Sequence, residues 1–172
     1  VGFNEIDFGS FVSPKAIPQL RDSAEVIEKL DFTNTSNKIM AIIGNLRGGE
    51  QALEHKAVNS LAFPFSISET FLEKNIHSNF EKGNETIQNL LQISNSKERE
   101  LVVYIAMAFG NPYGDDWSVD LLSDWVNKLM NMGVKTMVLA DTTGDGTSER
   151  ISQSFQAMSK NFPELEVGVH LH

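Results

Sequence analysis

Short apolar runs alternate with longer amphipathic stretches along the chain. The run Lys38-Ile-Met-Ala-Ile-Ile-Gly44 is almost wholly apolar, as expected for a strand that a parallel sheet buries on both faces. Runs and alternating patterns of this kind predict strands over residues 3–11, 38–44, 58–65, 100–109, 136–140 and 165–172. Apolar residues at helical spacing predict helices over residues 17–30, 50–55, 80–93, 118–133 and 148–161.

This alternation repeats about every 30 residues, which is typical of parallel βα units. Two α/β architectures fit it: an open doubly wound sheet and part of a (β/α)8 barrel. No Gly-x-Gly-x-x-Gly follows a predicted strand, which disfavours a dinucleotide-binding fold. Polar residues gather where strands end, namely Asp7, Ser10, Asn45, Ser66, Tyr104, Asp141, Thr142, His170 and His172. Because barrel enzymes build their sites at these ends, we predict a partial TIM barrel of about six βα units, forming one domain over residues 1–172.

Composition narrows the function classes. The 172 residues are 41% hydrophobic, which is enough for one domain with a substantial core. The formal net charge is -9 and no block of Lys or Arg is present, which argues against a nucleic-acid or anionic-membrane partner. The chain has no cysteine, and no apolar run approaches the roughly 20 residues of a membrane-spanning helix. We therefore predict a soluble, cytoplasmic protein without a nucleic-acid or membrane partner.

The last eight residues hold the candidate metal ligands. Apolar and polar residues alternate from Leu165 to His172, which is the pattern of a strand. His170 and His172 are two positions apart, so their imidazoles point to the same side. Two imidazoles at the carboxyl end of a strand form the nucleus of a divalent metal site. The alternatives are a pair of hydrogen-bonded core histidines and a fraying carboxyl terminus, because a His-x-His pair alone is weak evidence.

A set of segments carries a family resemblance. Ser10-Phe-Val-Ser-Pro-Lys-Ala-Ile-Pro-Gln-Leu20 resembles a signature of the 3-hydroxy-3-methylglutaryl-CoA lyase family. The likeness continues in the family's order at Asn45-Leu46-Arg47-Gly48, Ser68-Glu69, Lys74-Asn75-Ile76, Tyr104, Gly110-Asn111-Pro112-Tyr113-Gly114, Asp141-Thr142-Thr143-Gly144 and Val169-His-Leu-His172. The resemblance implies a TIM barrel that cleaves 3-hydroxy-3-methylglutaryl-CoA to acetyl-CoA and acetoacetate. It also implies a divalent cation, Mg²⁺ or Mn²⁺, and a place in leucine degradation and ketone-body formation.

The same resemblance assigns catalytic and metal-binding roles. His170 and His172 match the family's metal ligands. Asp141 matches the family's aspartate after the corresponding strand, and Asp7 matches a glutamate on the second barrel strand, whose side chain is one methylene longer. Together with His170, these two aspartates are the candidate catalytic residues.

Three further residues are candidates for binding an acyl-CoA substrate. Ser10 and Tyr104 match positions that line the family's acyl pocket, and Thr142 lies beside Asp141. Arg47 is a candidate for contact with a CoA phosphate, although a single arginine on an acidic protein is more often solvated or paired.

Each assignment has a structural alternative. Asp141 precedes Thr-Thr-Gly and is equally suited to stabilising a turn. Tyr104 lies in an apolar strand, where a tyrosine is more often a core residue. Ser10 precedes the bend at Pro14 and can satisfy local backbone groups, and Asp7 can cap a strand end.

Parts of the family's site have no counterpart in this sequence. The family's first strand carries a catalytic arginine and a metal-binding aspartate, whereas Arg21-Asp22 falls in a predicted helix. The family's eighth strand, its asparagine ligand and its cysteine-bearing loop are also unmatched. We therefore expect a partial barrel with impaired activity, whose two open sheet edges favour a homodimer or higher association. Two alternatives are a condensing relative, such as an isopropylmalate or homocitrate synthase, and an inactive fragment that self-associates.

Overall fold

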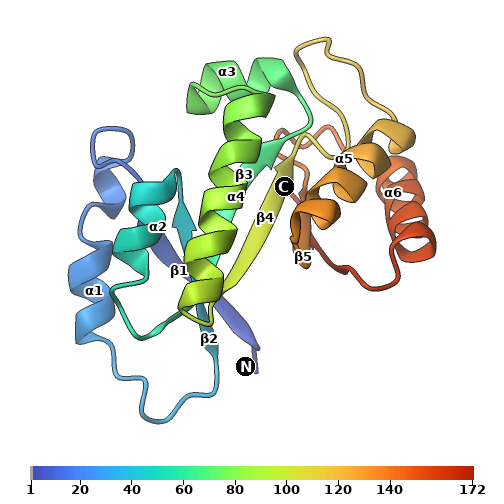
Figure 1. Ribbon diagram of the computed structural model, residues 1–172. Helices are drawn as coiled ribbons and strands as arrows, with labels where there is room; N and C mark the ends of the chain where they lie inside the picture. Colours follow the sequence, from blue (N-terminus) through green and yellow to red (C-terminus); the bar gives the residue numbers. More distant parts are fainter. Residues whose placement is uncertain (1) are drawn as a thin grey trace. The chain divides into compact units, whose positions relative to one another are not determined.

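The computed structural model describes residues 2–172, and Val1, the first residue of the predicted domain, lies outside this range. Contacts divide the chain into two compact units (Figure 1). The first comprises residues up to Phe63 together with Thr86–Leu101, and the second comprises Pro64–Glu85 together with Val102–His172. The single domain predicted over residues 1–172 stays a prediction.

The first unit is built on three parallel strands, with β2 in the middle. They are β1 (Glu5–Phe11), β2 (Lys38–Ile43) and most of β3 (Val58–Ser66). The accompanying helices are the 3-10 helix η1 (Pro18–Leu20), α1 (Ser23–Lys29), α2 (Leu46–Ala52) and the later part of α4 (Phe80–Ser96). The core of this unit is apolar and includes the buried side chains of Ile27, Ile39, Ala41, Ile43, Val58, Leu61, Ile87 and Leu90.

A glycine lets α2 begin earlier than its sequence pattern predicts. The side chain of Asn45 caps this helix by accepting a hydrogen bond from the N–H of Gly48 at 2.9 Å. Gly48 lies directly against the carbonyl oxygen of Phe11, which leaves no room for a Cβ. The helix therefore starts at Leu46 rather than at residue 50, because the cap and this close packing outweigh the low helix propensity of glycine.

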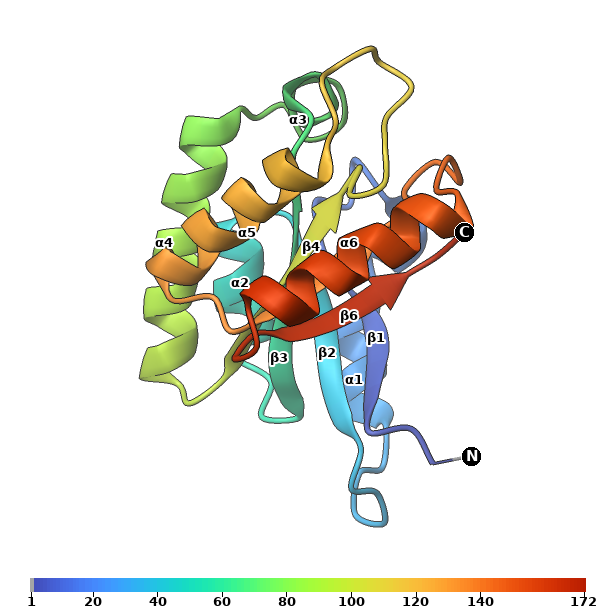
Figure 2. The same cartoon turned by 90° about the vertical axis from the view of Figure 1, so that its right-hand side faces the viewer.

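The second unit is built on three more parallel strands, with β5 in the middle. They are most of β4 (Glu100–Ala106), β5 (Thr136–Ala140) and β6 (Glu166–His170). The helices that lie wholly in this unit are α3 (Glu69–Ile76), α5 (Val119–Met132) and α6 (Ser148–Asn161). Figure 2 shows β6 in red running toward the carboxyl terminus. In the register, Val138 lies opposite both Tyr104 and Gly168, and Ala140 lies opposite His170.

The helix ends of the second unit confirm the predicted boundaries of α5. The hydroxyl of Ser118 accepts a hydrogen bond from the N–H of Leu121 at 3.0 Å, and Gly133 ends the helix with a φ of 107°. Ser68 caps α3 in the same way, through the N–H of Phe71. The pattern of apolar residues did not predict α3 as a helix, because only one of its residues, Leu72, is buried.

The predicted alternation of strands and helices is confirmed, with differences at element ends. The strand predicted to end at residue 109 ends at Ala106, because Met107 adopts a left-handed backbone conformation with a φ of 60°. The helix predicted over residues 17–30 is split into η1 and α1. The Ser23 hydroxyl donates a hydrogen bond to the carbonyl of Leu20 and accepts one from the N–H of Ser10, which fixes the break between them.

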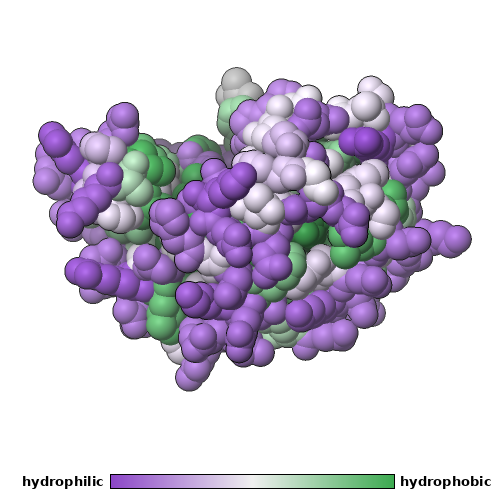
Figure 3. Space-filling view, turned by 90° about the horizontal axis from the view of Figure 1, so that it is seen from above, coloured by the Kyte–Doolittle hydropathy of each residue, from purple (hydrophilic) through white to green (hydrophobic). Residues whose placement is uncertain are grey.

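Most of the surface seen in Figure 3 is hydrophilic, with separate hydrophobic patches. Among residues 2–172, the exposed large apolar side chains lie on or beside the two terminal strands and on or beside η1 and α1, namely Phe3, Ile6, Val169 and Leu171 for the strands and Ile17, Leu20, Val26 and Leu30 for the helices. Across residues 2–172, no helix combines the length and the apolar character needed to cross a membrane. The predicted cytoplasmic location stays a prediction.

Candidate active site

Three rings meet at the carboxyl end of β6 in the second unit. His170 is the last residue of β6 and His172 lies two residues beyond it, and their ring centroids are 4.9 Å apart at an interplanar angle of 64°. The ring of Tyr104, from β4, lies 6.0 Å from that of His170 at 68°. Both histidines are exposed and Tyr104 is half-buried. The predicted same-side arrangement of the two imidazoles is thus present, and the histidines are not core residues.

The histidine pair fits part of a metal site. Two imidazole rings in contact can each present a nitrogen to one divalent cation, and imidazole is a common ligand for such ions. Within the described range 2–172, no cluster of three or more His, Cys, Asp or Glu side chains is placed to hold a metal ion. The pair therefore accounts for two ligands, and the remaining positions of a cation would be filled by other groups.

Asp141 and Thr142 follow β5, and their side chains form hydrogen bonds with backbone N–H groups. The N–H of Asp141 donates to the carbonyl of His170 at 2.9 Å. Its carboxylate is buried, and Oδ1 accepts a hydrogen bond from the N–H of Gly146 at 3.0 Å. The Thr142 hydroxyl accepts one from the N–H of Met107 at 3.2 Å. Asp141 thus stabilises its own loop, and Thr142 links that loop to the end of β4.

The loop after β4 is held by residues that the sequence did not identify as important. Asp115 accepts hydrogen bonds from the hydroxyls of Ser68 and Thr70 and from the N–H of Thr70. These bonds, chiefly the one from Ser68, hold the pKa of Asp115 below its usual 3.8. On the other side of the loop, Arg150 donates to the carbonyl of Phe109 at 3.3 Å. No local pattern indicates these pairs, since each joins residues about 40 positions apart or more.

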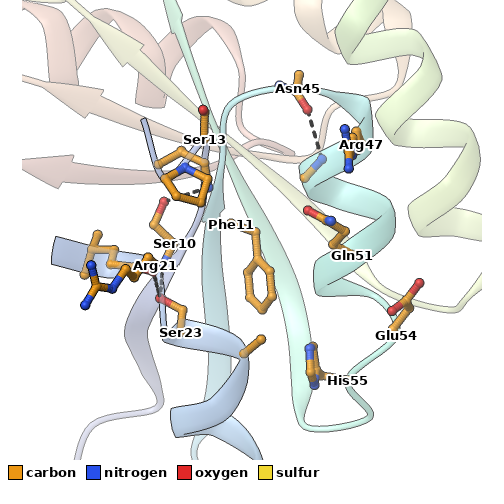
Figure 4. A pocket seen from close by; sticks show the side chains of 15 residues that line it. Ser10, Phe11, Ser13, Arg21, Ser23, Asn45, Arg47, Gln51, Glu54 and His55 are labelled. Carbon is orange, nitrogen blue, oxygen red and sulfur yellow. Dashed lines mark hydrogen bonds between the residues drawn. The ribbon is translucent and has the colours of Figure 1, made fainter. Parts of the chain in front are cut away.

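A separate pocket of about 500 Å³ lies in the first unit (Figure 4). Residues from two of the segments that carry the resemblance, residues 10–20 and 45–48, line it, including Ser10, Ser13, Asn45 and Arg47. Figure 4 shows Phe11 between the wall that carries Ser10 and the wall formed by α2, and its ring lies 5.4 Å from that of His55.

Ser10 has a structural role in this pocket. It is 3% exposed, and its hydroxyl accepts a hydrogen bond from the N–H of Val12 at 3.3 Å. This is the local backbone contact that the sequence offered as an alternative to substrate binding. Asp7 lies on β1, is exposed and pairs in register with Met40, and it is not among the residues that line the pocket.

The predicted site residues therefore fall into two groups. Asp7 and Ser10 belong to the first unit, and Tyr104, Asp141, Thr142, His170 and His172 belong to the second. Within the second unit the structure joins Tyr104, His170 and His172 as a group of rings. A single site formed by all seven residues stays a prediction.

Comparisons with known proteins place the chain in a family. The profile of the HMGL-like family matches residues 1–172. A curated relative from Pseudomonas aeruginosa, 3-hydroxy-3-isohexenylglutaryl-CoA/hydroxy-methylglutaryl-CoA lyase, is 30% identical over 171 residues, which cover 99% of this chain and 56% of that protein. The chain spans about half the length of the curated relatives that it matches.

Solved structures agree with this placement. The crystal structure of the Bacillus subtilis HMG-CoA lyase matches with a TM-score of 0.91 at 27% identity, over 99% of this chain and 57% of that one. An HMG-CoA lyase from Acinetobacter baumannii, solved in complex with coenzyme A and 3-methylmalate, matches with a TM-score of 0.88 at 28% identity, over 99% and 55%. The α/β fold and the partial TIM barrel predicted from the sequence are thereby confirmed. The chain belongs to the HMGL-like family.

Proposed function

We propose that this chain is part of a divalent-metal-dependent carbon–carbon lyase that cleaves 3-hydroxy-3-methylglutaryl-CoA to acetyl-CoA and acetoacetate, the reaction of leucine degradation and ketone-body formation. The observation that carries the proposal is the pair of imidazoles at the end of β6, which contact each other, with Tyr104 beside His170. A family match over the whole chain and relatives named as lyases of this substrate support it.

The reaction requires a metal site, a base and a means of stabilising an enolate. A base removes the proton of the C3 hydroxyl, the ketone of acetoacetate forms, and the C2–C3 bond breaks to leave the enolate of acetyl-CoA, which then takes up a proton. His170 and His172 would hold Mg²⁺ or Mn²⁺. When bound, the cation would polarise the oxygens of the substrate and stabilise the developing negative charge.

Two carboxylates are candidates for the proton transfer. The N–H of Gly146 fixes Oδ1 of Asp141 and would leave Oδ2 to accept the hydroxyl proton. Asp7 is the second candidate and, with a side chain one methylene shorter than glutamate, would need a closer approach to the substrate. His170 would act in catalysis through the cation.

We assign acyl-CoA binding to Ser10, Tyr104 and Thr142. The pocket of the first unit, with Arg47 on its wall, would accept part of the CoA moiety. A relative solved with coenzyme A supports a CoA ester as the ligand class. The Ser10-Phe-Val-Ser-Pro-Lys15 segment favours the lyase over a condensing relative.

Self-association is a second proposal, and a specific observation favours it. Apolar side chains are exposed on both terminal strands or beside them, with Phe3 64% and Leu171 53% exposed. An uncovered strand edge with apolar side chains favours pairing with another chain. Sedimentation of the purified chain across a range of concentrations would reveal the dimer or higher oligomer that we expect.

A lyase assay tests the main proposal. The purified protein is incubated with 3-hydroxy-3-methylglutaryl-CoA and Mg²⁺ or Mn²⁺, and both products are quantified by mass spectrometry. We expect equimolar acetyl-CoA and acetoacetate, lost with a chelator and in His172→Ala, but retained in His77→Asn, which changes an exposed histidine with a left-handed backbone that asparagine tolerates.

Each other outcome selects an alternative. Metal binding that depends on His172, without product, identifies an inactive fragment. Consumption of acetyl-CoA in the presence of a 2-oxo acid identifies a condensing enzyme. Neither metal binding nor product rejects the proposal.

A further inference from the structure

Tyr104 and His170 touch although a whole strand separates them. Tyr104 lies on β4 and His170 on β6, with β5 between, yet their ring centroids are 6.0 Å apart in an edge arrangement. This separation lies within the 4.5–7 Å over which aromatic rings attract each other in edge-to-face geometry. We propose that Tyr104 is a positioning residue that holds the imidazole of His170 in one orientation.

The strand register explains how the two rings meet. Tyr104, Val138 and Gly168 form one row across the three strands, so their side-chain positions share a face of the sheet. His170 is two residues beyond Gly168 on that same face, and its partner in the register is Ala140. The residues beside the line from Tyr104 to His170 include Ala140 and Gly168, which are small. They leave room for the large ring on β4 to reach β6.

Gly168 has a specific part in this arrangement. A Cβ at this position would lie 3.2 Å from Cγ2 of Val138, which is closer than ordinary van der Waals contact. Any larger residue there would push against Val138, which lies opposite Tyr104 in the register. A glycine at this position therefore leaves the neighbour of Tyr104 in the row undisplaced.

The contact matters because His170 is otherwise exposed. An exposed histidine samples three staggered χ1 wells, and only some of them leave its ring beside that of His172. A half-buried tyrosine ring on one side and the His172 ring on the other restrict this freedom before any ligand binds. As far as it concerns metal binding, the inference rests on the proposed function of the pair.

Nuclear magnetic resonance of the metal-free chain tests the positioning directly. The ring current of Tyr104 shifts the ring protons of His170, so Tyr104→Leu should move these resonances toward those of an exposed histidine, and Tyr104→Phe should retain the shift. Tyr113→Leu is the matched control, because the chain's other tyrosine contacts Asn75 and Lys74 instead. Unchanged His170 resonances in Tyr104→Leu would overturn the proposal.

Gly168→Ala keeps the test decisive if Tyr104→Leu does not fold. The added methyl group should displace Val138, the neighbour of Tyr104 in the row, and so shift the same His170 resonances, while those of His55 and His77 stay in place. Identical His170 resonances in the wild type and Gly168→Ala would then count against the proposed contact.

A Mn²⁺ titration followed by electron paramagnetic resonance separates this inference from the proposed function. We expect Tyr104→Leu to bind Mn²⁺ about threefold more weakly than the wild type, as when one of three χ1 wells is no longer selected, and Tyr104→Phe to restore the affinity. A wild-type chain that binds no Mn²⁺ would reject the metal pair, whereas the ring-proton shifts would still decide the positioning.

Discussion

The two units use their motif residues in different ways. In the first unit, Ser10 and Asn45 turn their side chains to nearby backbone N–H groups and so build the walls of a pocket. In the second unit, His170 and His172 are exposed at a strand end and contact other rings. The first arrangement fixes the shape of a cavity, and the second leaves donor atoms open to a ligand.

Asp141 and Thr142 show that this division does not follow the unit boundary. They lie in the second unit beside the histidines, yet they bond to Gly146 and Met107 through backbone N–H groups, as Ser10 does. A match to family motifs therefore does not distinguish side chains that fix the backbone from side chains that are open to a ligand. The hydrogen bonds and exposure of each side chain in the structure make this distinction.

Substitution of Gly48, which lies against the wall of the pocket in the first unit, is expected to reduce stability most. In Gly48→Ala the new methyl group would press on the carbonyl oxygen of Phe11, and backbone can move little, so we expect a loss of about 1–3 kcal/mol in the free energy of unfolding. Urea unfolding followed by circular dichroism measures it.

Gly49→Ala is the matched control in the same helix. Its Cβ would lie 2.7 Å from Cδ2 of Leu90, the end of a flexible side chain that can rotate away. The loss should be smaller, because the end of a side chain yields more readily than the backbone carbonyl that Gly48 meets, whereas the gain in helix propensity of about 0.5–1 kcal/mol is common to both variants. Equal losses for the two variants would show that the contact with Phe11 does not shape the pocket wall.

The sequence predicted the strands better than the ends of strands and helices and the segments that connect them. Strand positions follow from apolar runs and alternating patterns, and all six predicted strands are present. The end of β4 could not be predicted, since Met107 adopts a left-handed conformation and donates its N–H to the hydroxyl of Thr142, 35 residues away. The break within the helix predicted over residues 17–30 could not be predicted for the same reason, because it depends on a bond between Ser10 and Ser23.

The candidate site could be predicted only in part. The spacing of His170 and His172 placed both rings on one side of a strand, which the structure bears out. Their contact with Tyr104 could not be predicted, because it depends on the register of three strands and on the small residues between them. The sequence did not identify Asp115, because an aspartate in a loop is typical of a turn. Its partners Ser68 and Thr70 lie 47 and 45 positions away in the sequence.

A smaller effect is expected where Asp115 anchors the loop after β4, and it should depend on pH. Hydrogen bonds from Ser68 and Thr70 lower the pKa of Asp115 in the folded chain relative to the unfolded one. Its contribution to stability is therefore present above the usual value of 3.8 and is lost as the pH falls through the folded pKa. Asp115→Asn should lower the free energy of unfolding by about 1 kcal/mol at pH 7, as loss of a helix cap does.

Urea unfolding of Asp115→Asn and the wild type between pH 2 and 7 measures this dependence. The two curves should converge below the folded pKa, where the wild-type carboxyl is protonated. Asp116→Asn, at the exposed neighbouring position, should follow the wild type throughout. A constant difference between Asp115→Asn and the wild type at every pH would mean that the charge of Asp115 is not what anchors the loop.

The smallest effect is expected at Arg150, which holds the same loop from its other side. Its guanidinium donates to the carbonyl of Phe109 and lies 4.9 Å from the ring centre of Trp117. Arg150→Met keeps the apolar stem and removes both contacts, so we expect a loss of about 0.5–1 kcal/mol in urea unfolding.

Lys128→Met is the control for the cation–π contact alone, since the ammonium of Lys128 lies 4.3 Å from the ring centre of Trp125. If the bond to Phe109 holds the loop, Arg150→Met must cost more than Lys128→Met. Equal costs would mean that the bond from Arg150 contributes little. The loop would then be fixed on this side chiefly by the bond from the indole N–H of Trp117 to the carbonyl of Ala108.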